Sequence, residues 1–232
     1  VPDAAFSPLE NPFRVMGKAF DNRAGLSVMI EAFKTLCREG HPNTLIAAAT
    51  VQEEVGTRGA KTAGVAMRPD CVALLDPLPE ALSSLDAYQA ANYRWRNWRE
   101  LYQHALRVPA NRLDEAGALW GPCQLADRTL PPLFGGLLEV LPRLAALAEK
   151  TAADAGIPFQ LTVRRSGGTD AAALHLSGRG VPTIVLGIPT RYIHAHNGVL
   201  DLRDYRAAVE LTVALVRALD REAVEALTHY LP

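Results

Sequence analysis

The sequence predicts an α/β fold in three layers, α/β/α, built around a mostly parallel mixed sheet. Helical and strand patterns alternate along the chain, which is typical of a sheet covered by helices on both faces. Two apolar runs, residues 44–51 and 71–75, each stop at acidic residues. Open α/β sheets bind their ligands at the carboxyl ends of the strands. We therefore expect the functional residues at that edge of the sheet.

The first third of the chain predicts one helix and two strands. Residues 1–16 contain prolines without periodicity and are expected to be a connecting stretch. Apolar residues at spacings of three and four predict an amphipathic helix at 22–38, which ends near Gly40. The apolar run 44–51 predicts a buried strand, and the run 70–77 predicts a second strand that proline stops.

The middle of the chain, residues 79–130, has the weakest pattern and contains all three tryptophans. A lid, a partner surface or ordinary core packing would each account for these aromatic side chains, and core packing is favoured. After it the pattern becomes regular again. It predicts, in order, a helix at 133–155, a strand at 159–163, a glycine turn with a short helix at 171–176, a strand at 182–188 and a closing amphipathic helix at 202–228.

Composition narrows the class of protein. The net charge of −1 and the lack of a basic run argue against nucleic acid as the main partner. No segment reaches the roughly 18 apolar residues that a membrane span requires. Cys37, Cys71 and Cys123 are widely spaced, which favours reduced, mostly buried thiols in a cytoplasmic protein and no zinc role. The chain begins at Val1, and we expect its natural beginning to be missing.

Acidic residues and a histidine gather beside strand ends and glycine turns. They lie in four segments, residues 17–23, 52–56, 74–77 and 191–194. Carboxylates together with an imidazole suit zinc, cobalt or manganese better than calcium or copper. Adjacent residues point in different directions, so one carboxylate of the pair at 53 and 54 can bind a metal while the other acts as a general base. The pattern therefore favours a divalent metal site.

Each of these residues also has an ordinary structural explanation. Asp21 can cap the helix that follows it, and Asp76 before proline is a common turn residue. A lone His194 is more often structural than a ligand, and adjacent glutamates are often a solvated turn. The residues alone leave these alternatives open.

The motifs that contain these residues resemble those of one known family. They are GKAFDNRAG at 17–25, TVQEEVGTRGA at 50–60, SGGTDAAALHLSGRGVPTIVLGIPTRYIHAH at 166–196 and DLRDY at 201–205. In this order they are similar to the M42 metallo-aminopeptidases, the tetrahedral and glutamyl aminopeptidases. The resemblance implies a zinc-peptidase-like catalytic domain over 17–232, with residues 79–117 as a possible insertion.

The resemblance also implies a role for each candidate residue. Asp21 would bridge two divalent ions, zinc or cobalt with manganese as a further option. Glu54 and His194 would hold one ion, and Asp76 would hold the other. Glu53 would be the general base. The family's substrate region would correspond to Gly168, Asp170 and Arg191, and the substrates would be peptides.

One departure from the family pattern bears on function. The family supplies a further metal-binding histidine from an H-x-D segment upstream, and a β-rich domain that assembles homo-oligomers; neither precedes Gly17 here. We expect a truncated member, whose second metal site and activity are affected. The alternatives are a non-catalytic binding or assembly subunit and, less favoured, a glycoside hydrolase, which would need two carboxyl groups about 5–10 Å apart and no metal.

Overall fold

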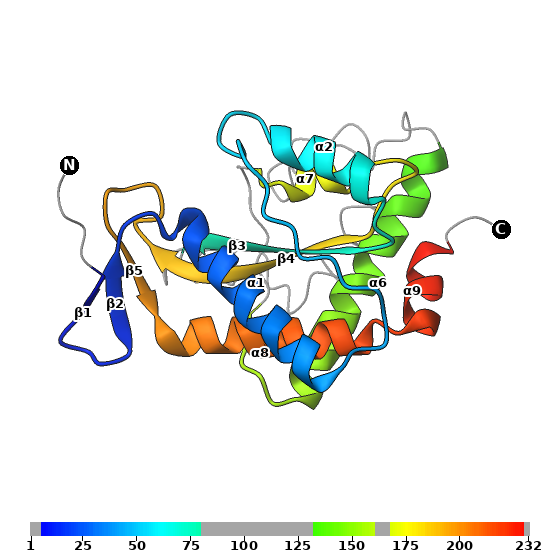
Figure 1. The fold of residues 1–232 in the computed structure, drawn as a ribbon. Helices are drawn as coiled ribbons and strands as arrows, with labels where there is room; N and C mark the ends of the chain where they lie inside the picture. The colour runs from blue at the N-terminus through cyan, green and yellow to red at the C-terminus, as the bar shows by residue number, and fades with distance from the viewer. Residues whose placement is uncertain (1–5, 80–131, 161–167, 230–232) are drawn as a thin grey trace, which may run out of the picture.

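The computed structural model describes residues 6–79, 132–160 and 168–229 (Figure 1). Within these ranges five strands form one mixed sheet in the order β1-β2-β5-β4-β3. The strands are β1 (Ser7–Pro8), β2 (Arg14–Gly17), β3 (Val72–Pro79), β4 (Thr183–Arg191) and β5 (Gly198–Asp201). The helices are α1 (Phe20–Glu39), α2 (Arg58–Met67), α6 (Pro132–Asp154), α7 (Ala171–Leu174), α8 (Leu202–Ala218) and α9 (Arg221–Thr228).

Helices lie on both faces of the sheet, as the alternating pattern predicts. Side chains of α1, α6 and α8 pack in shared clusters with Leu75, Leu186 and Ile188, which face the same side of β3 and β4. Figure 1 shows α2 and α7 on the side of the sheet opposite α8. The predicted α/β class and mixed sheet are confirmed.

The described strands are less parallel than expected. Only β3 and β4 are parallel, in a register that runs from Val72 opposite Thr183 to Pro79 opposite Thr190. The pairs β1–β2, β2–β5 and β4–β5 are antiparallel. The connection from β4 to β5 is only residues 192–197. So short a connection favours antiparallel neighbours, because a parallel crossover needs a dozen residues or more.

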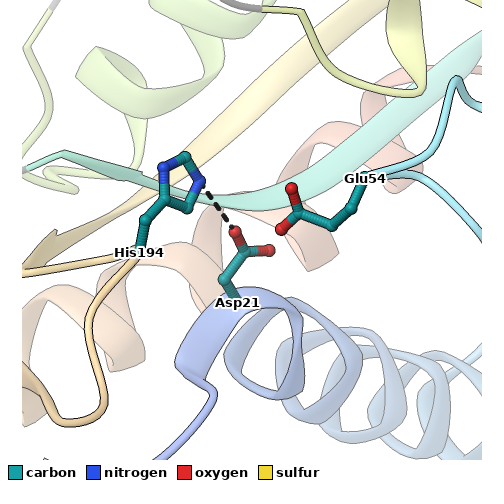
Figure 2. A group of neighbouring side chains, drawn as sticks. All are labelled: Asp21, Glu54 and His194. Carbon is teal, nitrogen blue, oxygen red and sulfur yellow. Dashed lines mark ion pairs between the residues drawn. The ribbon is translucent and has the colours of Figure 1, made fainter.

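These pairings bring two separate parts of the chain to one edge. Strand β2 is antiparallel to β5, and β5 is antiparallel to β4, so β2 and β4 run in the same direction. Their carboxyl ends, at Gly17 and Arg191, therefore lie at the same edge of the sheet. Asp21 follows β2 and His194 follows β4, and Figure 2 shows both side chains at this edge.

The predicted strand at 44–51 is wrong. This segment forms no ladder with a described strand, and Ile46 and Val51 are 54% and 68% exposed. Leu45 and Thr50 are its half-buried positions. An apolar run predicts a strand only if a neighbouring strand takes up its backbone hydrogen bonds.

The ends of several helices and strands also differ from the predicted ones. Strand β3 continues through Pro77 to Pro79, because proline is tolerated where its missing N–H is not needed in the ladder. The closing helix is two helices, α8 and α9, since Asp220 accepts a hydrogen bond from the Ala223 N–H (2.8 Å) and caps a new helix. Helix α7 ends at Leu174, two residues early.

Some of the remaining predicted helices and strands agree with the structure, and others do not. Strands β1 and β2 lie in the stretch expected to be connecting. The predicted helices at 22–38 and 133–155 correspond to α1 and α6. Residues 159–160 are not in a strand, while the rest of that predicted strand and the tryptophan-containing region at 80–131 lie outside the described residues.

The two described cysteines differ in exposure. Cys37 is exposed on α1, contrary to the expectation of buried thiols, because the neighbouring Leu36 takes the position that faces the core. Burial, reinforced by the charge of Asp70, raises the pKa of the half-buried Cys71 thiol to about 11. Cys123 lies outside the described residues. No helix in the described part of the chain is long and apolar enough to cross a bilayer.

Helix α1 approaches β3 so closely that one position has no room for a side chain. A Cβ atom on Gly25 would lie 2.4 Å from the Leu75 carbonyl oxygen and 2.2 Å from Asn22 Oδ1. The first of these neighbours is backbone and cannot rotate away. Gly25 therefore sets the separation between α1 and the sheet.

We predict that Gly25→Ala lowers the free energy of unfolding by about 1–3 kcal/mol, as overpacking does. The alanine's better helix propensity, about 1 kcal/mol, offsets only part of this loss. Urea unfolding measures the change. Gly168→Ala is the control, because no atom of the described residues lies within 4 Å of a Cβ added there. Equal stability of the two variants would contradict the close approach.

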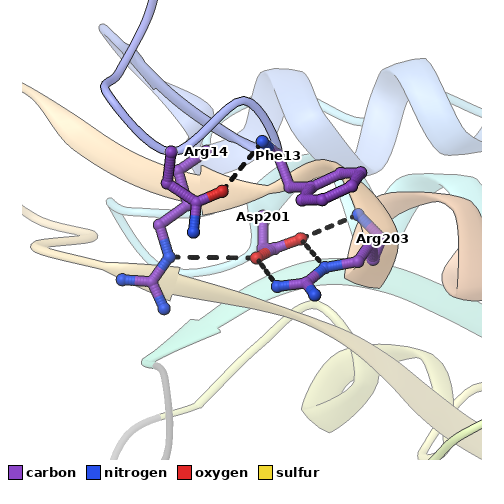
Figure 3. A network of polar contacts seen from close by, with 5 residues as sticks. Phe13, Arg14, Asp201 and Arg203 are labelled. Atoms are coloured by element: carbon purple, nitrogen blue, oxygen red, sulfur yellow. Dashed lines mark hydrogen bonds and ion pairs between the residues drawn. The ribbon is translucent and has the colours of Figure 1, made fainter.

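Asp201 links β2, β5 and the start of α8, as Figure 3 shows. Its carboxylate accepts hydrogen bonds from the Arg203 backbone N–H (2.9 Å) and from Arg203 Nε and Nη2 (3.0 and 2.7 Å). Arg14 Nε lies 3.8 Å away. The Arg203 guanidinium also lies over the Phe13 ring, 4.7 Å from its centroid. The hydrogen bonds from Arg203 hold the pKa of Asp201 below its ordinary value of 3.8.

We predict a pH-dependent effect for Asp201→Asn. Asparagine keeps an oxygen for the helix cap but loses the ion pairs, so stability at neutral pH should fall by less than about 1 kcal/mol at this surface site. Because folding lowers the pKa, the difference is fully present well above pH 3.8 and disappears as pH falls through the folded-state value.

Urea unfolding of both proteins across this pH range tests the prediction. Asp220→Asn, in the cap of α9, is the control for cap chemistry alone. A difference that stays constant from neutral pH into the acid range would contradict the assignment to ion pairing.

Candidate metal centre

Asp21, Glu54 and His194 converge at the carboxyl edge of the sheet. One ligand atom of each lies within 4.8 Å of the others, and Figure 2 shows the three side chains pointing toward one another. His194 Nε2 lies 3.3 Å from Asp21 Oδ2. Asp21 is half-buried, while Glu54 and His194 are exposed. Within the described ranges this is the group of side chains best arranged to hold a metal ion.

Asp21 is fixed where α1 begins. The Asp21–Asn22 peptide bond is cis, and neither residue has helical backbone angles. The Asn22 side-chain amide donates to the Leu75 carbonyl and to Asp76 Oδ1, each at 3.0 Å. These bonds tie the start of α1 to β3, so Asp21 is held against the sheet.

Glu54 lies in a turn that leads into α2. The amides of Gly56 and Thr57 donate to the Glu53 carbonyl (3.0 and 2.9 Å), and the Gly59 amide donates to the Val51 carbonyl (3.0 Å). A Cβ on Gly59 would lie 2.4 Å from that same Val51 oxygen. Because glycine alone allows this approach, the turn that presents Glu53 and Glu54 is closely defined.

A left-handed residue precedes each of the three side chains by two positions. The φ angles are 55° at Ala19, 62° at Gln52 and 58° at Tyr192, before Asp21, Glu54 and His194 respectively. Non-glycine residues in this region cost about 1–2 kcal/mol each. Such conformations cluster at functional sites, where the surrounding structure enforces them. A left-handed residue at the same relative position therefore turns the backbone before each of the three side chains, so that each side chain enters the site.

The carboxyl groups at this edge repel one another. Burial, followed by the charge of Glu54, raises the pKa of Asp21, and His194 opposes this shift. Burial also raises the pKa of Glu53, with the charges of Glu54, Asp170 and Asp21 adding to it. A cation between the carboxylates would remove the repulsion.

The three residues line an open hollow of about 390 Å³, with Lys18 and His196 on its wall. His196 is not part of the convergent group, although it lines the same hollow. A larger hollow of about 700 Å³ lies at the opposite edge, beside Asp70 and Val181 where β3 and β4 begin. That larger hollow holds no comparable group of ligands among the described residues.

The other residues singled out from the sequence lie outside this group. Asp76 is half-buried in β3 and accepts the hydrogen bond from Asn22. Gly168 and Arg191 are exposed and do not line the hollow as the described residues define it. Asp170 is only 4% exposed, and its Oδ2 accepts a hydrogen bond from Thr50 Oγ1.

Sequence reasoning missed Asn22, Thr50 and the three left-handed residues. Asn22 lies inside a motif that was recognised, but its amide contacts depend on the position of β3. Thr50 ends an apolar run and looks like a strand residue. A left-handed conformation at Ala19 or Gln52 has no sequence signal, since neither is glycine or asparagine.

The donor set fits a divalent transition metal. Two carboxylates and one imidazole provide oxygen and nitrogen ligands, which suit zinc, cobalt or manganese. A site with three protein ligands keeps a position open for water or substrate, as catalytic metal sites do. Asp21, Glu54 and His194 can therefore hold one such ion.

Comparison with known proteins agrees with this chemistry. The sequence profile of the M42 glutamyl aminopeptidases matches residues 1–87 and 136–211. The glutamyl aminopeptidase of Lactococcus lactis is 30% identical over 220 residues, which is 95% of this chain and 52% of that protein. The chain spans about half the length of the curated relatives it matches.

Solved structures show the same relationship. A TET aminopeptidase from a marine sediment archaeon of the Thaumarchaeota has a TM-score of 0.72 and 31% identity, covering 98% of this chain and 56% of its own. The Pyrococcus horikoshii TET1 peptidase, which can assemble into a tetrahedron or a large octahedral shell, has a TM-score of 0.62 and 26% identity, covering 92% and 53%. With more than half of its residues matched by the family profile, the chain belongs to the M42 glutamyl aminopeptidase family.

Proposed function

We propose that this chain carries the metal centre of an aminopeptidase that removes N-terminal residues from peptides. The observation that carries the proposal is the convergence of Asp21, Glu54 and His194 within 4.8 Å, beside Glu53, in a chain of this family. Metal-dependent peptide hydrolysis needs such a ligand set and a neighbouring base.

The proposed ligand roles start from the convergent group. Asp21, Glu54 and His194 would hold the first divalent ion, zinc or cobalt. Asp76 and Asp21 would together hold a second ion. The Asn22 amide, which binds Asp76 Oδ1 and directly follows Asp21, supports the proximity of these two carboxylates. Asp76 lies outside the convergent group, so the second ion has fewer described ligands than the first.

When bound, the ions would supply Lewis-acid polarisation of the scissile carbonyl and would make a water molecule more acidic. Glu53 lies in the same turn as Glu54, directly before this proposed metal ligand. Its carboxylate accepts the proton of the attacking water and then donates a proton to the departing amine. The open hollow at the edge of the sheet admits the end of a peptide.

The activity and assembly of the whole protein are part of the same proposal. The P. horikoshii TET1 peptidase assembles into closed shells, and we propose that proteins containing this chain also form homo-oligomers. The free cysteines among the described residues are consistent with the reducing cytoplasm.

We predict that Glu53→Gln keeps its divalent ions and loses turnover by at least about 100-fold, since general-base catalysis contributes about 10²–10⁴-fold. Turnover is measured with a panel of aminoacyl p-nitroanilides in zinc or cobalt, and bound metal by elemental analysis. Glu54→Gln is the matched comparison and should lose metal as well as activity. Normal turnover in Glu53→Gln would exclude it as the base.

We also predict that His194→Ala weakens the affinity for zinc by at least about tenfold, because one of three neutral or anionic donors is lost. Isothermal titration calorimetry of the metal-free protein with zinc measures this affinity. His41→Ala is the control, since His41 Nδ1 contacts Asn43 within a surface turn. His196→Ala tests the neighbouring histidine. An unchanged zinc affinity in His194→Ala would contradict the proposed ligand set.

A further inference from the structure

Asp170 is an unusual carboxylate for its surroundings. It is 4% exposed, and its Oδ2 accepts a hydrogen bond from the Thr50 hydroxyl. Its Oδ1 is buried and has no hydrogen-bond partner among the described residues. A buried carboxylate with one donor is costly, and such a group in a native structure calls for an explanation.

The bond to Thr50 joins segments that are 120 residues apart in the sequence. Thr50 directly precedes the turn that presents Glu53 and Glu54. The segment before it, 44–49, has no ladder to a described strand, and residues 46–49 are exposed. Among the described residues, the hydroxyl–carboxylate bond is therefore one attachment of the chain on the entry side of the turn, beside the packing of Leu45 in a core cluster.

The chain that leaves the turn is attached to the region that contains Asp170 and α7. Helix α2 begins at Arg58 and packs against α7, which Asp170 directly precedes. The approach is close, because a Cβ on Gly64 would lie 2.1 Å from Ser177 Oγ, just beyond α7. Both ends of the turn are thus anchored to the short region that contains Asp170 and α7.

The other two side chains of the metal centre belong to a different part of the fold. Asp21 and His194 follow β2 and β4, which are connected through β5. Glu54 reaches them from the layer of α2 and α7. The position of the α7 region relative to this turn therefore decides how far Glu54 lies from Asp21 and His194.

From these contacts we infer that Asp170 is a positioning residue, which acts through the Thr50 hydroxyl to hold Glu53 and Glu54 opposite Asp21 and His194. The inference rests on the proposed metal centre. It assigns Asp170 no contact with substrate or metal. Any hydroxyl at position 50 and any acceptor oxygen at position 170 should form the hydrogen bond that positions the turn.

The test uses Thr50→Val, which removes the hydroxyl at nearly constant volume, and Thr50→Ser, which restores it. Thr50→Val should bind cobalt about tenfold more weakly, with altered visible absorption of the bound ion, and Thr50→Ser should return both toward the wild type. Asp170→Asn should keep most of the affinity, since its oxygen still accepts from Thr50. Thr151→Val is the control, because that hydroxyl bonds only the local Leu147 carbonyl.

Hydrogen exchange of the metal-free proteins supplies a readout that is independent of metal binding. Thr50→Val should raise exchange at residues 50–59 and leave α1 unchanged. Unchanged exchange there, or raised exchange with unchanged cobalt affinity and spectrum, would overturn the inference. A wild-type chain that binds no cobalt would instead overturn the proposed function, and the exchange comparison would then decide alone whether Asp170 holds the turn.

Discussion

The register of three strands is the constraint on which the site depends. Strand β5 pairs with β2 on one side and β4 on the other, so Gly17 lies opposite Gly198 and Arg191 lies opposite Val199. This pairing places the chain after β2 and the chain after β4 side by side. A slip of one residue would turn each strand's side chains to the opposite face and separate the two connections. The ion pair of Asp201 with Arg14 joins β5 to β2 and so helps to keep this register, while its pair with Arg203 joins β5 to the start of α8.

The site is arranged at the expense of local stability. Three non-glycine residues adopt left-handed conformations beside it, several carboxyl groups crowd together, and Asp170 is buried with a single described donor. None of these features would favour folding alone. Three of the left-handed residues and the crowded carboxyl groups lie together at one edge of the sheet, which is the physical sign of a preorganised binding site. Thr57 and Arg68, at the two ends of α2, are also left-handed. The core clusters of α1, α6 and α8 against the sheet hold the fold, and one of them, with Val15, Ala24 and Leu200, extends to the elements that carry this edge.

The sequence predicted what periodicity and residue chemistry determine locally. The spacing of apolar residues located α1, and apolar runs located β3 and β4. The strand expected at 44–51 was wrong because a strand depends on its neighbour, which a single run does not encode. Asp220 ended a helix that periodicity alone would continue. The motifs containing Asp21, Glu54 and His194 drew attention to residues that converge, whereas the contact of Thr50 with Asp170 joins distant segments and had no local signal.

The central claim is that one divalent ion sits among Asp21, Glu54 and His194. Anomalous diffraction from zinc-soaked crystals, recorded on both sides of the zinc absorption edge, tests it most directly. The account predicts a strong anomalous peak about 2.0–2.2 Å from His194 Nε2 and from a carboxylate oxygen of each acid. A peak bound by other residues, or none at this edge of the sheet at saturating zinc, would contradict it.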